Sequence, residues 1–331
     1  MIDANSTRPV TSAPAYLDNS SFSTAIPGLQ LAIDSTSLGE FKLCPRRYQL
    51  GVVEGWQPRG TSPHLQFGLW LHSAVERYWH SRTASQDHQT ALAEALAWLM
   101  AATWEPATGR GWLSDHKIKN RLSLVRTLVW YLDEKAQDDT LQPITLANGL
   151  PAVELSFTFD LGLASAVGEP FVVCGHLDRI AELSGEPYVV DIKTTSGGLT
   201  PAYFDQFSPD NQMSLYSLAG KIVYDLPIRG VIIDACQIGV TFSRFHRGLV
   251  QRTASQLDEW LADTRSWVRQ LERAALDSIW PMNDKACTGP YGDCPFRPVC
   301  RKPASARQQW LQSDYARRKW DPLKARTAPA S

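Results

Sequence analysis

The sequence predicts an α/β protein with a mixed central sheet flanked by helices. Three observations point to this class. The hydrophobic period changes from helical to alternating near residue 150, the later elements read as three strands, a helix, two strands and a helix, and 44% of the 331 residues are hydrophobic. That hydrophobic content is enough for a sizeable buried core, and strands mixed with helices favour a sheet covered by helices.

The two ends of the chain differ in composition from its interior. Residues 1–30 are rich in Ser, Thr, Pro and Ala, without an apolar stretch behind a basic start, so we expect a disordered leader and no signal peptide. No later segment has the uninterrupted apolar length that a bilayer requires, so we expect a cytoplasmic protein without membrane contact. The predicted domain then covers residues 31–303, and residues 304–331 form a basic C-terminal tail.

Helical patterns dominate the first half of the chain. The segment from Ser37 to Glu40 has the form of a capping box and predicts a short helix that runs towards Cys44. Longer amphipathic patterns follow at 64–80, 88–104 and 117–135, the last two within a helical insert at 82–148.

The second half alternates apolar with polar residues and is rich in β-branched and aromatic side chains. Strands are predicted at 152–160, 171–182 and 187–195. The sequence Ser184-Gly185-Glu186-Pro187 predicts a turn between the last two strands. A helix, two strands and a long helix complete the predicted core at 210–224, 229–237, 239–246 and 254–275.

Two of these strands carry carboxylates. Asp178 lies near the middle of an apolar strand, and Asp191 lies on the next strand, two positions before Lys193. Side chains two positions apart share a strand face, so Asp191 and Lys193 project together. If Asp178 is their neighbour across the turn, two acids and a lysine converge, and a divalent cation is the natural partner of such carboxylates. An Asp–Lys ion pair on a strand face is the alternative.

The same residues form a series of motifs. In chain order they are Gly68-x-x-x-His72, Gly175-His-Leu-Asp178-Arg179, Asp191-Ile-Lys193-Thr194-Thr195 and Gln212-x-x-x-Tyr216. This order, over about residues 65 to 220, resembles the RecB-like branch of the PD-(D/E)xK nuclease superfamily. The resemblance implies that residues 31–303 form a metal-dependent nuclease domain with the core fold of restriction endonucleases.

The resemblance also implies roles for the motif residues. His72, Asp178 and Asp191 would be metal ligands, Lys193 would orient or activate the attacking water, and Gln212 and Tyr216 would flank the site from one helix face. The metal would be Mg²⁺ or Mn²⁺, and a nitrogen ligand would shift the preference towards Mn²⁺. Without the resemblance, His72 and Tyr216 would be ordinary core residues and Gln212 a solvent-facing one. Glu154 is a possible further acid near the site.

Cysteines supply a separate observation. Cys287, Cys294 and Cys300 lie in a Gly/Pro/Asp-rich loop at 281–303, which favours a metal site over disulfides in a cytosolic protein. Together with Cys44-Pro-Arg, they resemble the RecB-like nucleases that carry an iron–sulfur cluster, which implies a [4Fe–4S] cluster on four thiolates. Zn²⁺ is the alternative, because the spacing of the first pair is wider than is common in those nucleases.

The other two cysteines, Cys174 and Cys236, fall in apolar strands, and we expect them to be buried thiols.

A formal net charge of −1 gives no global attraction to phosphate, so nucleic-acid binding would depend on local basic patches. One candidate patch is the chain after residue 300, with Arg301, Lys302, Arg307, Arg317, Arg318, Lys319, Lys324 and Arg326. The other consists of Lys117, Lys119, Arg121 and Arg126. Solvated helix faces are the alternative interpretation of both.

These observations predict a DNA exonuclease that acts on single strands or free ends in recombination, repair or end processing. The sequence has no G-x-x-x-x-G-K-[ST] phosphate loop, so we expect a helicase or recombination partner to supply any unwinding. A phage system, bacterial repair and CRISPR adaptation fit equally. The alternative is a non-catalytic DNA-end-binding or scaffold protein, but the intact Asp178, Asp191 and Lys193 favour the enzyme.

Overall fold

The computed structural model describes residues 20–60, 62–137, 140–289, 292–318 and 320–323. The predicted leader lies outside the described residues up to residue 19. The chain divides into two compact units. Among the described residues, the first unit contains 20–60, 157–175 and 253–323, and the second contains 62–156 and 176–252. No helix of the described segments is long and apolar enough to cross a membrane.

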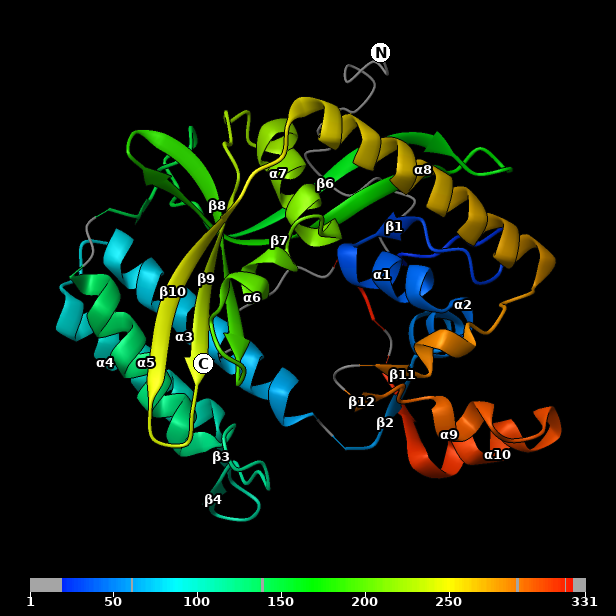
Figure 1. The fold of residues 1–331 in the computed structure, drawn as a ribbon, viewed down its shortest axis with the longest axis horizontal. Helices are drawn as coiled ribbons and strands as arrows, with labels where there is room; N and C mark the ends of the chain where they lie inside the picture. Colours follow the sequence, from blue (N-terminus) through cyan, green and yellow to red (C-terminus); the bar gives the residue numbers. More distant parts are fainter. Residues whose placement is uncertain (1–19, 61, 138–139, 290–291, 319, 324–331) are drawn as a thin grey trace. The chain divides into compact units, whose positions relative to one another are not determined.

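Strands β7 (Pro170–Leu183), β8 (Glu186–Thr195), β9 (Val231–Ile238) and β10 (Ser243–Val250), which lie mostly in the second unit, form a mixed sheet (Figure 1). Strand β8 pairs antiparallel with β7 and parallel with β9. Strand β9 in turn pairs antiparallel with β10, and the short β5 (Gln142–Pro143) pairs with the end of β7. The predicted mixed α/β class is therefore confirmed.

The last strand of this sheet begins later than the sequence indicated. We predicted a strand at 239–246, but residues 239–242 form a turn in which the Gly239 amide donates to the Phe242 carbonyl at 2.8 Å. The guanidinium of Arg126 donates to the carbonyl oxygens of Gly239, Val240 and Phe242. These hydrogen bonds fix the turn. Because Arg126 lies on a helix far away in the sequence, the local pattern at 239–246 could not predict them.

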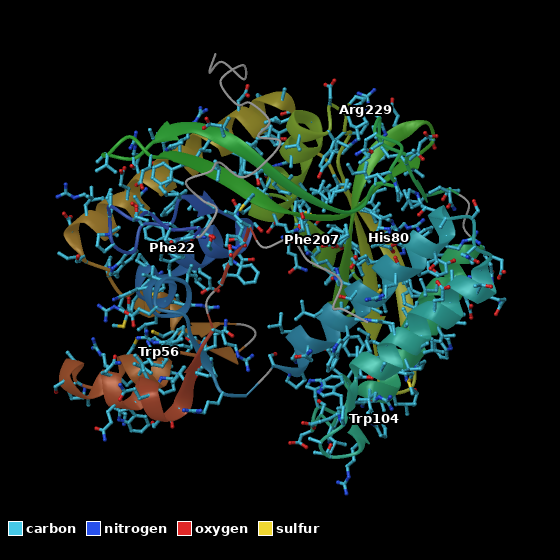
Figure 2. The ribbon with its side chains drawn as sticks, turned by 180° about the vertical axis from the view of Figure 1, so that it is seen from behind. Phe22, Trp56, His80, Trp104, Phe207 and Arg229 are labelled. Carbon is cyan, nitrogen blue, oxygen red and sulfur yellow. The ribbon has the colours of Figure 1, made fainter. Side chains whose placement is uncertain are left out.

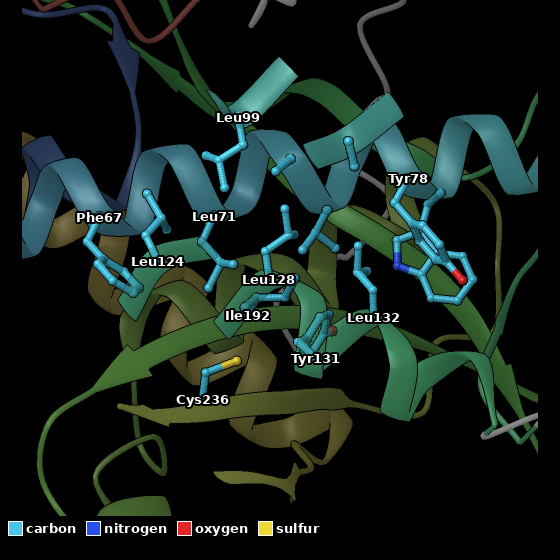
Figure 3. Packing of buried hydrophobic residues seen from close by; sticks show 14 of the residues in the cluster. Phe67, Leu71, Tyr78, Leu99, Leu124, Leu128, Tyr131, Leu132, Ile192 and Cys236 are labelled. Carbon is cyan, nitrogen blue, oxygen red and sulfur yellow. The ribbon is translucent and has the colours of Figure 1, made fainter. Parts of the chain in front are cut away.

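Three helices cover one face of the sheet: α3 (Pro63–Thr83), α4 (His88–Ala102) and α5 (Arg121–Ala136). Figure 3 shows Leu71, Leu128 and Tyr131 of these helices in one apolar cluster with Ile192 and Cys236 of the strands. The prediction that Cys236 is a buried thiol is confirmed, as it is for Cys174 in the first unit. Burying these apolar side chains together is the main stabilising contribution of this unit.

The helix predicted from residue 117 begins at Arg121. Asn120 caps it, because its side chain accepts from the Ser123 amide at 3.0 Å while the Ser123 hydroxyl accepts from the Asn120 amide at 3.1 Å. A short hairpin, β3 (Trp104–Glu105) with β4 (Arg110–Gly111), connects α4 to the chain before α5.

The opposite sheet face carries α7 (Asn211–Val223), which follows the short α6 (Pro201–Asp205). Successive side chains of a strand point to opposite faces. Since Ile192 packs into the helical core of Figure 3, its neighbours Asp191 and Lys193 face α7. The predicted helix at 210–224 is thus found, and it lies beside the charged face of β8.

The first unit is built from short elements around one long helix. These elements are β1 (Ala32–Ile33), α1 (Ser35–Leu43), α2 (Pro45–Tyr48), the π-helical turn η3 (Gln49–Val53), β2 (Trp56–Pro58), α8 (Ala254–Asp277), the 3₁₀ turn η4 (Asp284–Ala286), β11 (Thr288–Gly289), β12 (Gly292–Asp293), α9 (Arg297–Cys300), α10 (Ala304–Asp314) and β13 (Tyr315–Arg317). The remaining strand, β6 (Val153–Ala164), begins in the second unit and ends in the first.

The capping box of α1 lies one turn earlier than predicted. Asp34 is the cap, and its carboxylate accepts from the Ser37 amide at 2.8 Å, while the Ser37 hydroxyl accepts from the Asp34 amide. Our assignment of Ser37 as the cap and Glu40 as its partner was wrong. Glu40 instead pairs with Arg47. The Asp34 carboxylate accepts from the Ser37 amide, one of the first-turn amides that have no backbone partner within a helix.

Two stretches that we predicted as termini carry folded structure. Phe22 and Gln30 form an antiparallel bridge, and Leu29 between them is fully buried. After residue 303, α10 is followed by β13, which pairs antiparallel with β2. The Arg317 guanidinium stacks 4.6 Å from the centre of the Trp56 ring, so part of the predicted basic tail contributes to the packing of the first unit.

Candidate metal-dependent active site

A tight hairpin brings the two acidic strands together in the second unit. The turn between β7 and β8 consists of Ser184 and Gly185, which both have positive φ (+53° and +81°), as a two-residue hairpin turn requires. The register places Asp178 beside the following strand, where its Oδ2 accepts from the Ile192 amide at 3.0 Å. The predicted turn and the predicted proximity of the two acidic strands are both found.

A chain of polar contacts extends from β8 to α7. Lys193 Nζ lies 2.7 Å from Asp191 Oδ2, and it also donates to Gln212 Oε1 at 2.7 Å. Gln212 Nε2 donates in turn to the Tyr216 hydroxyl at 2.8 Å. Gln212 and Tyr216 are one helical turn apart, as their spacing predicted. The lysine is therefore held from two sides in a defined position.

Helix α3 contributes His72 to the same site. Its Nδ1 lies 3.1 Å from Asp178 Oδ2, so one carboxylate oxygen is shared between the imidazole and the Ile192 amide. All six residues predicted from the motifs, His72, Asp178, Asp191, Lys193, Gln212 and Tyr216, thus belong to two contact groups that meet at β8.

Burial and charge have opposite effects on the two acids. For Asp178, burial raises the pKa, but the His72 charge and hydrogen bond outweigh it, so the pKa of Asp178 lies well below its usual range. For Asp191, burial raises the pKa and the Asp178 charge adds to this, so the net shift is upward despite Lys193. Burial lowers the pKa of His72, but Asp178 raises it by more. The surroundings of Asp191 therefore favour its neutral form, although Lys193 lies beside it.

A small cavity of about 10 Å³ opens between α3, β6 and β7, with His72, Glu76, Glu154 and Asp178 in its lining. This cavity has room for about one water molecule. Glu154 has a φ of +50°, a left-handed conformation that non-glycine residues rarely adopt and that is often found at functional sites. The sequence suggested Glu154 as a further acid, and the structure places it on this cavity.

Glu76, on the same cavity, has no role in the motifs described above. Glu76 follows His72 by one helical turn, and this spacing could have indicated that both face the same cavity.

The donor set fits a hard divalent cation by its chemistry. Two carboxylates and an imidazole suit Mg²⁺ or Mn²⁺, and added positive charge would offset the raised pKa of Asp191. Among the described residues, however, no three His, Cys, Asp or Glu side chains stand in an arrangement that could hold an ion. The predicted ligands instead pair with protein groups, namely His72 with Asp178 and Asp191 with Lys193.

The four cysteines proposed as cluster ligands all belong to the first unit and form no disulfide. The Asn283 amide donates to Cys44 Sγ at 3.3 Å, and the Cys294 amide donates to the Cys287 carbonyl at 3.0 Å. Burial raises the pKa of Cys300, and Cys294 and Cys44 are both near enough to add to this shift. The thiols thus share one neighbourhood, but the described structure does not arrange them as a ligand set.

Most side chains of the predicted basic cluster at 117–126 form hydrogen bonds within the second unit. Lys119 is only 2% exposed, and its Nζ donates to the Thr194 hydroxyl at 2.8 Å. Burial lowers its pKa to about 8. Arg121 donates to Thr103 and Met100, and Arg126 binds the turn described above. Of the four residues, Lys117 is exposed, whereas Arg121 and Arg126 are partly buried.

Comparison with known proteins gives one family and several solved structures with partial similarity. A family model described as the PD-(D/E)XK nuclease superfamily matches residues 35–301, a range that includes all the motif residues and the four cysteines. A solved structure from Eubacterium rectale, named a putative exonuclease, is similar at 12% identity and a TM-score of 0.45, covering 84% of this chain and 92% of that chain. The structure of SSO0001 is similar at 14% identity and a TM-score of 0.29, covering 69% and 84%. No curated protein matches.

Proposed function

The chain belongs to the PD-(D/E)XK nuclease superfamily, and on that premise we propose that it is a metal-dependent DNA exonuclease. Its substrates are single strands or free DNA ends that arise in recombination, repair or end processing. The observation that supports this proposal best is the contact chain Asp191–Lys193–Gln212–Tyr216, which meets the His72–Asp178 pair at β8.

Each group has a task in phosphodiester hydrolysis. His72, Asp178 and Asp191 would hold Mg²⁺ or Mn²⁺, which supplies Lewis acidity and a more acidic bound water. The Lys193 ammonium offsets the charge that develops on the phosphate and positions the attacking water. Gln212 accepts a hydrogen bond from the Lys193 ammonium and donates one to the Tyr216 hydroxyl, so it fixes the direction of that ammonium.

An end-labelling experiment tests the proposal. DNA carrying a 5′ or a 3′ label, single-stranded and double-stranded, is incubated with the purified protein and Mn²⁺ or Mg²⁺, and in parallel with EDTA. We expect stepwise shortening from an end that stops in EDTA. Binding of DNA ends without any cleavage in either metal would instead support the non-catalytic scaffold function.

The metal preference depends on His72. We expect Mn²⁺ to support cleavage at least as well as Mg²⁺, because an imidazole ligand favours transition ions. We expect Ca²⁺ to bind without turnover, because its looser coordination misplaces the attacking water. His72→Ala should weaken Mn²⁺ affinity by at least tenfold, since even residues that only orient ligands contribute about 10–100-fold. The measurement is a Mn²⁺ titration of cleavage rate. His64→Ala, an exposed histidine of the same helix, is the control and should match the wild type. An unchanged titration for His72→Ala would remove it from the ligand set.

We also propose that Cys44, Cys287, Cys294 and Cys300 bind a [4Fe–4S] cluster. Their common neighbourhood and the amide donated to Cys44 support this proposal, and four thiolates could also bind Zn²⁺. Protein purified without oxygen should be brown with about four irons per chain. Cys44→Ala should lose the colour, whereas Cys174→Ala and Cys236→Ala, at buried thiols, should keep it. One zinc and no iron would select the alternative, and no metal would refute both.

A further inference from the structure

The second unit contains a cavity that the proposed catalytic residues do not use. It has a volume of about 510 Å³ and lies where the β3–β4 hairpin meets helix α3. Three tryptophans line it: Trp70 from α3, Trp104 from β3 and Trp112 just after β4. We call it the tryptophan pocket. Its volume falls within the range of sites that bind small molecules, for which aromatic linings are typical.

The rings of this pocket are held in place before any ligand binds. Trp70 and Trp112 pack edge to face, with ring centres 4.8 Å apart and planes at 69°. The Trp112 amide donates to the Thr103 carbonyl at 2.7 Å, which ties the end of the hairpin to the end of α4. Gly109 has a φ of +63°, which lets the hairpin turn back so tightly.

Trp104 nevertheless remains 48% exposed. Figure 2 shows it on the hairpin that follows α4. An aromatic face held open to solvent in this way is available for stacking.

Positive charge lies beside the exposed ring. The Arg121 guanidinium lies 5.8 Å from the centre of the Trp104 ring, and it is fixed there by donating to Thr103 Oγ1 at 2.9 Å and to the Met100 carbonyl at 3.1 Å. A side chain at Gly111 would come within 2.6 Å of Arg121, so the glycine makes room for this cation. Arg110 also lines the pocket and is exposed.

The pocket is connected to the active centre by two short links. The first link is helix α3, on which Trp70 precedes His72 by two residues, although side chains at this spacing point to different faces of the helix. On the other side, Lys119 from the segment after the hairpin donates to Thr194, the residue that follows Lys193. The pocket and the active centre are therefore attached to the same helix and to the same segment after the hairpin.

We propose that the tryptophan pocket receives an unpaired nucleobase of the single strand that the active centre cleaves. The inference rests on the proposed nuclease function and specifies its substrate as a strand with unstacked bases. Aromatic faces beside cations suit nucleic acid in particular, because every base has a π-face to stack and every base is followed by a phosphate. Arg110 and Arg121 supply the complementary charge for that phosphate.

Strand binding without cleavage tests this inference. Fluorescently labelled single-stranded oligonucleotides are titrated in EDTA against the wild-type protein, Trp104→Ala and Trp104→Phe. A second oligonucleotide has the same phosphates but abasic sugars. We expect Trp104→Ala to bind the normal strand about 5- to 150-fold more weakly and the abasic strand as the wild type does, since one stacked base contributes that much. Trp104→Phe should recover most of the affinity.

Trp130→Ala is a matched control. Trp130 is 44% exposed and has the Arg126 guanidinium 5.6 Å from its ring centre, but it lies on α5 outside the pocket. It should bind both strands as the wild type does. Three results would each overturn the inference. The first is an equal loss of affinity in Trp104→Ala and Trp130→Ala, the second is an equal loss on normal and abasic strands, and the third is full affinity of Trp104→Ala for the normal strand. Full affinity would instead indicate an apolar side chain of a protein partner as the occupant.

Because these titrations need no turnover, the inference and the proposed nuclease function can fail separately. A wild-type protein that cleaves DNA while Trp104→Ala binds normally would refute only the pocket. A wild-type protein that shows the predicted stacking pattern but never cleaves would refute only the nuclease function.

Discussion

Replacing Lys193 or Asp191 by alanine should abolish DNA cleavage without unfolding the protein. Lys193→Ala removes the cation that faces the reacting phosphate, and loss of one such stabilising group costs about 10²–10³-fold in rate. Asp191→Ala should cost at least as much, because it also removes a metal ligand. Neither change opens a large cavity. Burial raises the pKa of Asp191, so its charged form does not stabilise the folded protein, and its removal should not lower stability.

Single-turnover cleavage of end-labelled DNA, together with urea unfolding, checks this prediction. Asp205→Ala and Lys221→Ala serve as controls, because they remove the same charges from α6 and α7 away from the contact chain. Both should cleave at the wild-type rate. If Asp191→Ala or Lys193→Ala, once purified and folded, also cleaves near that rate, the assignment of the active centre is wrong.

The largest loss of stability is expected at Asp234, a carboxylate on β9 with no exposed surface. Its oxygens lie 3.4 Å from Lys135 Nζ, 3.4 Å from Arg179 Nη2 and 3.6 Å from Arg247 Nε, and it accepts from the Tyr131 hydroxyl at 2.9 Å. Asp234→Ala should destabilise the protein by about 3–5 kcal/mol, because it leaves buried cations without their counter-charge.

Urea unfolding at neutral pH measures this loss. Asp133→Ala is the control: Asp133 is 47% exposed and lies 2.9 Å from His88. An exposed ion pair contributes at most about 1 kcal/mol, so this variant should stay near the wild type. If the free energy of unfolding of Asp234→Ala also stays within about 1 kcal/mol of the wild type, the three cations must find other partners or solvent, and the prediction is wrong.

Arg179 illustrates why the motif alone could not assign every role. It follows Asp178 in the motif, but consecutive strand residues point to opposite sides. Its guanidinium is 2% exposed, contacts Asp234 and stacks 4.6 Å from the Trp79 ring centre. The motif residue next to the proposed metal ligand therefore belongs to a buried ion network. Asp234 had no sequence signal beyond being a polar residue in an apolar strand.

The helix and strand pattern was predictable to within a few residues, and its errors have local causes. The helix predicted from residue 117 begins at Arg121 because Asn120 and Ser123 cap each other. The strand predicted from residue 239 begins at Ser243 because Arg126 fixes the preceding turn. In the first case the Asn120 side chain accepts from a backbone amide and so ends the extended segment before the helix. In the second case the distant Arg126 side chain determines where β10 can begin to pair with β9.

The sequence by itself determined the mixed α/β class, the hairpin at Ser184-Gly185 and the proximity of Asp178 to the strand of Asp191 and Lys193. These follow from a two-residue alternation and a short turn, which act over neighbouring residues. Tertiary structure alone decided that Lys119 is buried against Thr194 and that Trp70, Trp104 and Trp112 enclose one pocket. Such contacts join residues tens of positions apart, and they depend on how whole elements pack, which local periodicity does not encode.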